Sequence, residues 1–131
     1  MGLGKCGRAI DFLSRYANKT ETAVEYMREW PVRIQFTLRG EEPFHVIVED
    51  GQMQVQAGRL PDAEAEFRSA SDVFFDVMTG HMDPSEGFTM KKYEIKGSVF
   101  DVIRFRHVGD LTEASNKAIF GMLRRMATLV S

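Results

Sequence analysis

The sequence predicts an α+β fold in which helices cover one face of an antiparallel sheet. Apolar residues recur at helical spacing near both ends of the chain, over residues 8–29 and 112–130. Between residues 32 and 68 the period changes to two, which is typical of strands with one apolar and one polar face. Such an apolar face has to be covered, so we expect the helices to pack against it.

Length and composition are those of one globular domain, which we expect to span residues 1–131. The net charge of −2 at pH 7 does not favour nucleic acid or an anionic membrane as a partner. The unusual feature is the content of 8 Met and 10 Phe, because both side chains fill irregular apolar space. These residues form either a packed core or the lining of a hole.

The amino-terminal residues favour neither a targeting signal nor a nucleotide site. Cys6 is the single cysteine, so an internal disulfide is excluded. The sequence has no run of about 18 apolar residues, and we expect a cytoplasmic protein. Residues 2–7 read GLGKCG, but no strand precedes them as a dinucleotide-binding turn requires. We therefore expect residues 1–7 to form a flexible leader.

Two helices are expected before the sheet. The first lies between Arg8 and Lys19, where apolar residues fall at helical spacing. The second follows Thr20, a favourable N-cap residue, and runs to about Glu29. Pro31 ends it, because the residue before a proline avoids helical dihedral angles.

Four successive strands are expected over residues 32–68, as an antiparallel meander. Asp50-Gly51 is a strong hairpin signal between the second and third strands, and Pro61-Asp62 marks a turn before the fourth, which starts near Ala63. The register matters, since a slip of one residue would turn the apolar side chains to the other face. The side chains expected to face the helices are Ile34, Phe36, Val46, Val48, Val55 and Phe67.

Two short helices are expected next. Ser71 can cap the first, and Gly80 closes it as the left-handed residue beyond its end. Asp83 caps the second, with Pro84 at its first position and Glu86 three residues after the cap. Both helices are rich in Met and Phe, so they are expected to supply part of the cover of the sheet.

The remainder of the chain predicts a fifth strand and a long helix. Residues 93–100, YEIKGSVF, alternate as a strand does, and residues 99–108 are ambiguous between strand and helix. From Thr112 to about Val130, within the region 111–131, we expect one C-terminal helix. Its wide apolar arc consists of Ala118, Ile119, Met122, Leu123, Met126, Leu129 and Val130, with Phe120 at the edge.

Residues 44–67 and 69–97 resemble the sterol carrier protein type 2 lipid-binding domain. The order carried here is strand, Asp-Gly turn, strand, Pro-Asp turn, strand, Ser-Asp helix, then M-T-G-x-M-D-P and a strand ending in Gly97. The segment MTGHMDPSEGF, residues 78–88, is the most specific part of the resemblance. In all, the resemblance covers about residues 32–110.

The resemblance implies a five-stranded, mostly antiparallel sheet covered on one face by helices, with an apolar tunnel between the layers. The ligand would be a lipid or another apolar small molecule. The alternative is that the Met and Phe residues simply pack, as an apolar stripe at helical spacing usually does. The residues that we expect to line the tunnel are Ile34, Phe36, Val46, Phe74, Met78, Met82, Phe88, Met90, Phe100, Ile119, Met122 and Leu123.

The polar residues favour binding over catalysis. His45, His81 and His107 are scattered without the spacing of a zinc site. Cys6 has no nearby His to activate it as a nucleophile, and no serine lies in a G-x-S-x-G motif. Capping explains Asp83 without any further role. We therefore expect no enzyme, no metal, no cofactor and no nucleic-acid partner.

Three functions stay open at this point. The leading one is a non-catalytic carrier that binds and transfers fatty acyl chains, sterols or similar lipids; burying eight methylenes contributes about 6 kcal/mol before ordering costs. The second is an accessory module that presents a hydrophobic intermediate to a partner enzyme, or forms a homodimer, through the C-terminal helix. The third is an enzyme acting on a steroid-like substrate, which would need a buried carboxyl group with a raised pKa.

Overall fold

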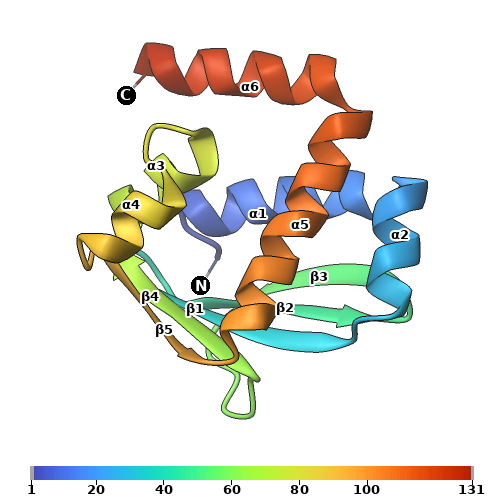
Figure 1. Cartoon of the computed structure of the whole chain (residues 1–131), viewed down its shortest axis with the longest axis horizontal. Coiled ribbons are helices and arrows are strands. Elements are labelled where there is room, and N and C mark those ends of the chain that lie inside the picture. The colour runs from blue at the N-terminus through green and yellow to red at the C-terminus, as the bar shows by residue number, and fades with distance from the viewer. Residues whose placement is uncertain (1, 131) are drawn as a thin grey trace.

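The computed structural model describes residues 2–130, apart from the side chains of residue 124 and residues 127–130. Helices cover one face of a five-stranded sheet (Figure 1), so the α+β class expected from the sequence is confirmed. The helices are α1 (Lys5–Ala17), α2 (Glu21–Arg28), α3 (Ser71–Thr79), α4 (Pro84–Thr89), α5 (Val99–Ser115) and α6 (Lys117–Val130). The strands are β1 (Val32–Arg39), β2 (Phe44–Glu49), β3 (Gln52–Ala57), β4 (Ala65–Ala70) and β5 (Tyr93–Gly97).

The sheet has the strand order β3-β2-β1-β4-β5. Its β1–β2, β2–β3 and β4–β5 pairings are antiparallel, whereas β1 and β4 are parallel, with Phe36 opposite Phe67. The expectation of four successive antiparallel strands is therefore wrong for the fourth, which also begins at Ala65 rather than at Ala63. Alternation along a strand shows which face is apolar, but it does not show the direction of the neighbouring strand.

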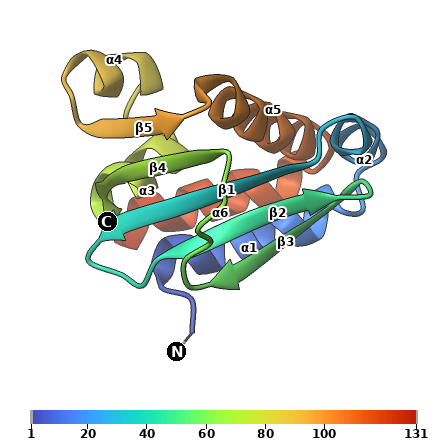
Figure 2. The same ribbon diagram turned by 90° about the horizontal axis from the view of Figure 1, so that it is seen from below.

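A crossover between β3 and β4 makes the parallel pairing possible. Residues 58–64 pass across the face of the sheet opposite the helices (Figure 2). The Leu60 N–H donates a hydrogen bond of 2.7 Å to Gln35 Oε1, and His45 Nδ1 lies 2.9 Å from the Gly58 carbonyl oxygen. Gln35 and His45 are buried by this segment although they lie on the polar face.

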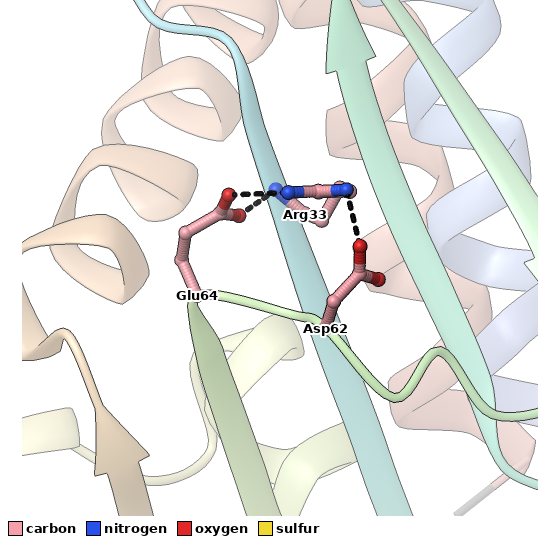
Figure 3. A network of polar contacts seen from close by, with 3 residues as sticks. All are labelled: Arg33, Asp62 and Glu64. Carbon is pink, nitrogen blue, oxygen red and sulfur yellow. Dashed lines mark hydrogen bonds and ion pairs between the residues drawn. The ribbon is translucent and has the colours of Figure 1, made fainter.

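The far end of the crossover is held by an arginine of β1. Arg33 forms ion pairs with Asp62 at 2.6 Å and with Glu64 at 3.2 Å, as Figure 3 shows. The pKa of Arg33 is raised, first through its hydrogen bond to Glu64 and then through the charges of Asp62 and Glu64. The contacts place the start of β4 beside β1 in the parallel register.

The apolar face of the sheet has the expected register. Val46 lies opposite Ile34 on one side and opposite Val55 on the other, so the three side chains share one face. On that face the expected residues Ile34, Phe36, Val46, Val48 and Phe67 are buried, and Val55 is partly buried. The sequence therefore predicted correctly which side the helices cover.

The glycine-rich start of the chain is packed rather than free. α1 begins at Lys5, so the expectation of a flexible leader is wrong for residues 5–7. The N–H groups of Cys6 and Gly7, both buried, donate to the Glu41 carboxylate at 3.1 and 3.2 Å. A Cβ at Gly4 would lie 2.7 Å from Glu41 Cβ. Glycine thus allows the carboxylate to cap a helix whose own N-cap residue has no side chain.

The short helices after β4 have the expected caps at Gly80 and Asp83, but not the one expected at Ser71. Gly80 closes α3 in the left-handed conformation, with φ of 83°. Asp83 accepts a hydrogen bond of 3.3 Å from the Ser85 N–H at the start of α4. The Ser71 hydroxyl, in contrast, does not cap α3 but donates to Glu41 at 2.5 Å. Glu41 therefore joins the starts of α1 and α3.

The last third of the chain differs most from the expectation. β5 ends at Gly97, and the ambiguous segment 99–108 belongs to helix α5. The single long helix expected within residues 111–131 is wrong, because Asn116 separates α5 from α6. Asn116 Nδ2 donates to the Thr112 carbonyl oxygen at 2.7 Å and to Thr20 Oγ1 at 3.1 Å. After this break, α6 runs over α1 and α3, on the side away from the sheet (Figure 1).

Candidate functional site

Packed phenylalanine rings cover the centre of the sheet. The ring centroids of Phe44, Phe105 and Phe74 lie 4.9, 5.3 and 5.4 Å from that of Phe36. Phe67 adjoins Phe36 and Phe74, at 6.1 and 5.2 Å. All five side chains are at most 8% exposed. We call this set the aromatic floor; it joins three strands of the sheet to α3 and α5.

Several apolar side chains of the helices pack against the buried core and are themselves only partly buried. Leu13 of α1, Phe75 and Met78 of α3, and Val102 and Leu111 of α5 pack against the core in this way. Each therefore has one side in contact with the protein and apolar surface left over. Surface of this kind can be buried further by an apolar ligand without taking the core apart.

Helix α6 packs against α1 through a residue near its own N-terminal end. The centroid of the buried Phe120 ring lies 6.1 Å from that of Phe12 and 5.6 Å from that of Tyr16 on α1, with edge-on geometry to both. Ile119 and Leu123 are partly buried. The last members of the apolar arc, Leu129 and Val130, have side chains outside the described part of the chain. The described contacts of α6 thus lie in its first half.

The twelve residues expected to line a tunnel fall into three groups. Four are buried: Ile34, Phe36, Val46 and Phe74. Four are partly buried: Met78, Met82, Ile119 and Leu123. Four are exposed: Phe88, Met90, Phe100 and Met122. The first two groups lie on the helix-covered side of the sheet, and contact of any of the twelve with a ligand stays a prediction.

Some residues of this region were not identified from the sequence. Phe105 belongs to the aromatic floor but lies in the segment that was ambiguous between strand and helix. Its spacing to Val108 and Thr112, all buried on α5, is the i, i+3, i+7 signal that could have identified the helix. Phe12 was not identified as a residue of this region because the sequence predicted the first helix only as a cover for the sheet. Its contact with Phe120 of α6 could not be predicted from the sequence.

Two surface depressions stand out in the described part of the chain, with volumes of about 490 and 230 Å³. The larger lies at the starts of α1 and α3, where Lys5, Arg39 and Asp72 contribute charges. The smaller lies along the β2–β3 hairpin. Neither lies between the aromatic floor and the helices, so the apolar tunnel implied by the family resemblance stays a prediction.

The shifted pKa values have structural causes. Burial raises the pKa of the Cys6 thiol to about 12, which leaves it protonated at neutral pH and unsuited to nucleophilic attack. Burial would also raise the pKa of Glu41, but hydrogen bonds from Ser71 and from the Cys6 and Gly7 amides lower it overall. The acid of a steroid-directed enzyme would need the opposite shift.

The histidines lie far apart in the fold. His45 is under the crossover, His81 Nδ1 is 2.7 Å from Thr79 Oγ1, and the His107 ring is 4.8 Å from that of Tyr26. Within residues 2–130, His, Cys, Asp and Glu side chains form no group of three or more that could hold a metal ion. The described helices also include none with the length and hydropathy needed to cross a membrane.

Several solved structures share this fold. UbiJ-SCP2, a ubiquinone synthesis protein, has a TM-score of 0.68 and 14% identity, over 82% of this chain and 96% of that one. Sterol carrier protein domain 2 of Helicoverpa armigera has a TM-score of 0.63 and 17% identity, over 82% and 87%. The sec-alkylsulfatase Pisa1 from Pseudomonas sp. has a TM-score of 0.57 and 8% identity. The match covers 67% of this chain but only 14% of the sulfatase. At such identities the likeness concerns the fold alone.

The fold is thus that of the sterol carrier protein structures. The profile of the SCP-2 sterol transfer family matches residues 12–109. The chain belongs to this family, as the resemblance of residues 32–110 implied. A comparison with curated proteins gives no match to the sequence.

Proposed function

We propose that the chain binds a lipophilic molecule beside the aromatic floor, among the half-buried apolar side chains of helices α1, α3, α5 and α6, and carries it without chemical change. The observation that carries the proposal is the set of half-buried apolar side chains on the helices that pack against a fully buried core. Membership of a sterol transfer family supports a lipid as the class of ligand. The whole chain, residues 1–131, would act as one lipid-binding domain in the cytoplasm.

The wall on the sheet side and the wall on the helix side would have different roles. The buried side chains are already close-packed and would present a rigid surface to the ligand. On the helix side, Met78 and Met82 have unbranched, flexible side chains that can adapt to ligands of different shape. The wall on the sheet side would comprise Ile34, Phe36 and Val46, and the wall on the helix side Phe74, Met78, Met82, Ile119 and Leu123. We leave the exposed Phe88, Met90, Phe100 and Met122 outside the lining.

Burial of apolar surface alone would supply the binding free energy, without a polar side chain that holds the ligand. Each methylene removed from water contributes about 0.8 kcal/mol, so eight of them contribute about 6 kcal/mol before ordering costs. The same arithmetic predicts weak discrimination, since one methylene more or less changes the binding free energy by only about 0.8 kcal/mol. We therefore propose a carrier for a class of lipids, such as fatty acyl chains or sterols, rather than for one compound.

A second candidate function is an accessory module in which α6 docks against a partner enzyme or a second copy of the chain. Met122 and Met126, one turn apart on α6, are 46% and 54% exposed. UbiJ-SCP2, which has the same fold, is a ubiquinone synthesis protein, and this favours a role beside enzymes that act on hydrophobic intermediates. In this reading the ligand is presented to the partner rather than moved between membranes.

Native mass spectrometry of the purified full chain tests the carrier. We expect a fraction of the protein to carry a lipophilic compound that organic extraction releases. Titration with a pyrene-labelled fatty acid should then show saturable binding that unlabelled fatty acid reverses. A chain that carries no compound and does not bind the probe would overturn the proposal.

Light scattering separates the two candidate functions. If α6 joins two copies, the chain should be a dimer that the paired change Met122→Ser and Met126→Ser dissociates, with the affinity for the fatty acid retained. The carrier alone predicts a monomer before and after the change.

A further inference from the structure

Exposed apolar side chains are concentrated at one edge of the molecule. Among the described residues, seven large apolar side chains are exposed, and five of them lie between residues 88 and 103. Their exposed fractions run from 46% to 75%. Single exposed apolar side chains are ordinary, but a local group of them marks a contact surface. The five are Phe88, Met90, Val99, Phe100 and Ile103.

The five side chains lie at the two ends of β5, an outer strand of the sheet. Figures 1 and 2 agree in placing α4 at the start of this strand and α5 at its end. Phe88 and Met90 close α4, and the ring centroid of Phe88 is 6.0 Å from that of Tyr93, the first residue of β5. With five residues in the strand, the two apolar groups are about 16 Å apart.

The first turns of α5 are apolar on two opposite faces. Phe105, Val108 and Thr112 are buried against the core. At 100° per residue, Val99, Phe100 and Ile103 lie on the other side of the helix, and all three are exposed. A helix that needed only to cover the sheet would carry polar residues on that second face. The second face is therefore apolar for another reason.

The charge of this edge has the opposite sign to the charge of the whole chain. Residues 88–107 contain five basic and two acidic residues, a net charge of +3, whereas the chain carries −2. The remainder therefore carries −5. One of the two acids, Asp101, accepts a hydrogen bond of 2.9 Å from Trp30 Nε1, and the other is the exposed Glu94. The basic residues Lys91, Lys92, Lys96, Arg104 and Arg106 are all exposed.

We propose that residues 88–107, which we call the β5 edge, dock the protein on an anionic lipid surface. The exposed Phe, Met, Val and Ile side chains would enter the interfacial layer, as those of an amphipathic helix do. The lysines and arginines would lie among the headgroups, where each contributes about 1 kcal/mol. The proposal rests on the proposed function in one respect: a lipid carrier has to meet the membrane from which it loads.

A lipid surface fits the β5 edge better than a protein partner does. The centre of a protein interface is depleted of charged residues, and of lysine in particular. Here Lys91 and Lys92 stand between the two apolar groups in the chain, close to Met90. A headgroup layer accepts apolar and cationic side chains next to each other, because it is polar at the surface and apolar a few ångströms below.

Sedimentation of the full chain with vesicles tests the proposal. We compare vesicles of phosphatidylcholine with vesicles of phosphatidylcholine and phosphatidylglycerol. The wild-type chain should bind the anionic vesicles more tightly, and salt should weaken that binding. The paired change Lys91→Glu and Lys92→Glu should lower the partition coefficient by about tenfold or more. Phe100→Ser should lower it by about tenfold.

Matched variants elsewhere on the surface are the controls. Lys19→Glu with Lys117→Glu makes the same change in net charge at exposed positions outside the β5 edge, and Met126→Ser removes an exposed apolar side chain from α6. These variants should bind the anionic vesicles within about twofold of wild type. Charges far from the lipid surface are screened by salt, and Met126 lies outside the β5 edge. Equal losses in test and control variants would overturn the proposal.

Binding of the pyrene-labelled fatty acid is measured on the same samples. A Lys91→Glu, Lys92→Glu chain that takes up the probe normally but no longer sediments with anionic vesicles supports a docking surface separate from the ligand site. A wild-type chain that binds the probe but no vesicle overturns docking and leaves an acidic protein as the class of partner. A chain that binds vesicles but no probe keeps the docking surface and overturns the carrier instead.

Discussion

Helices α1 and α6 are both amphipathic, but the fold covers their apolar faces to different extents. On α1, Cys6, Ile10 and Ala17 are buried, and the helix packs against β3 and α5. On α6, Phe120 is packed, whereas Met122 and Met126 are exposed. An amphipathic pattern therefore predicts that a helix has an apolar face, and it does not predict that the same chain covers that face.

The same contrast divides the molecule. We call α1, α2 and β1–β3 the closed region. We call α6, together with the continuous segment from α4 through β5 to the first turns of α5, the open region. All seven of the large apolar side chains that are exposed among the described residues belong to the open region. In the closed region apolar side chains make the core; in the open region several of them remain in contact with water. Mutations of matched residues can test this division.

The largest difference is expected between two phenylalanines. Phe36→Ala removes the ring at the centre of the aromatic floor and should lower the free energy of unfolding by about 3–5 kcal/mol. Phe100→Ala removes a ring that is mostly in water and should change it by no more than about 0.5 kcal/mol. Chemical denaturation of both variants measures the difference. Similar losses would mean that the open region is part of the core.

A smaller difference is expected between the two helices themselves. Ile10→Ala on α1 should cost about 2–5 kcal/mol of unfolding free energy, because the side chain is fully buried. Met126→Ala on α6 should cost less than about 0.5 kcal/mol. Thermal melting of the two variants beside wild type checks the comparison. A large loss for Met126→Ala in a monomer would show that α6 belongs to the closed region.

The closed region is also the part that the sequence predicts well. Alternation from Val32 to Val48 identifies the covered face correctly because each of these strands has one polar and one apolar side. The direction of β4 could not be predicted, since it depends on the crossover and on how Arg33 meets Asp62 and Glu64. Side chains that meet only in the folded chain leave no period in the sequence.

The open region was predicted less well for physical reasons. Residues 99–108 have apolar residues on two helix faces, so neither a helical nor a strand period dominates. The end of α5 depends on hydrogen bonds from Asn116 to Thr112 and to Thr20, which is far away in the sequence. Of the residues expected to line a ligand site, Phe100 illustrates the general difficulty: its apolar character is visible in the sequence, and its exposure is not.

The stabilisation that Glu41 provides at the start of α1 should depend on pH. Glu41 accepts hydrogen bonds from Cys6, Gly7 and Ser71, and its pKa is lowered from the ordinary value of 4.5. Its contribution is therefore present above pH 4.5 and is lost as the pH falls through the lower, folded-state pKa.

Glu41→Gln should cost about 1 kcal/mol of unfolding free energy at pH 7, the usual value for a helix cap. At pH 3 the difference from wild type should be smaller, because the carboxyl group of the unfolded chain is then mostly protonated and folding has to remove that proton. Denaturation at the two pH values measures this. Glu42→Gln, which changes an exposed neighbour, is the control, and an equal pH effect in that variant would contradict the assignment to Glu41.

The smallest change in stability is expected at Met78, where the two regions meet. Met53, on β3, is buried in the closed region, so Met53→Trp should overpack the core and cost about 1–3 kcal/mol. Met78 is only partly buried on α3, and if ligand space adjoins it, the larger ring of Met78→Trp can enter that space. We therefore expect Met78→Trp to keep the wild-type melting temperature and to abolish binding of the pyrene-labelled fatty acid. If the variant instead loses stability as Met53→Trp does and still binds the probe, Met78 belongs to the packed core and the ligand lies elsewhere among the helices.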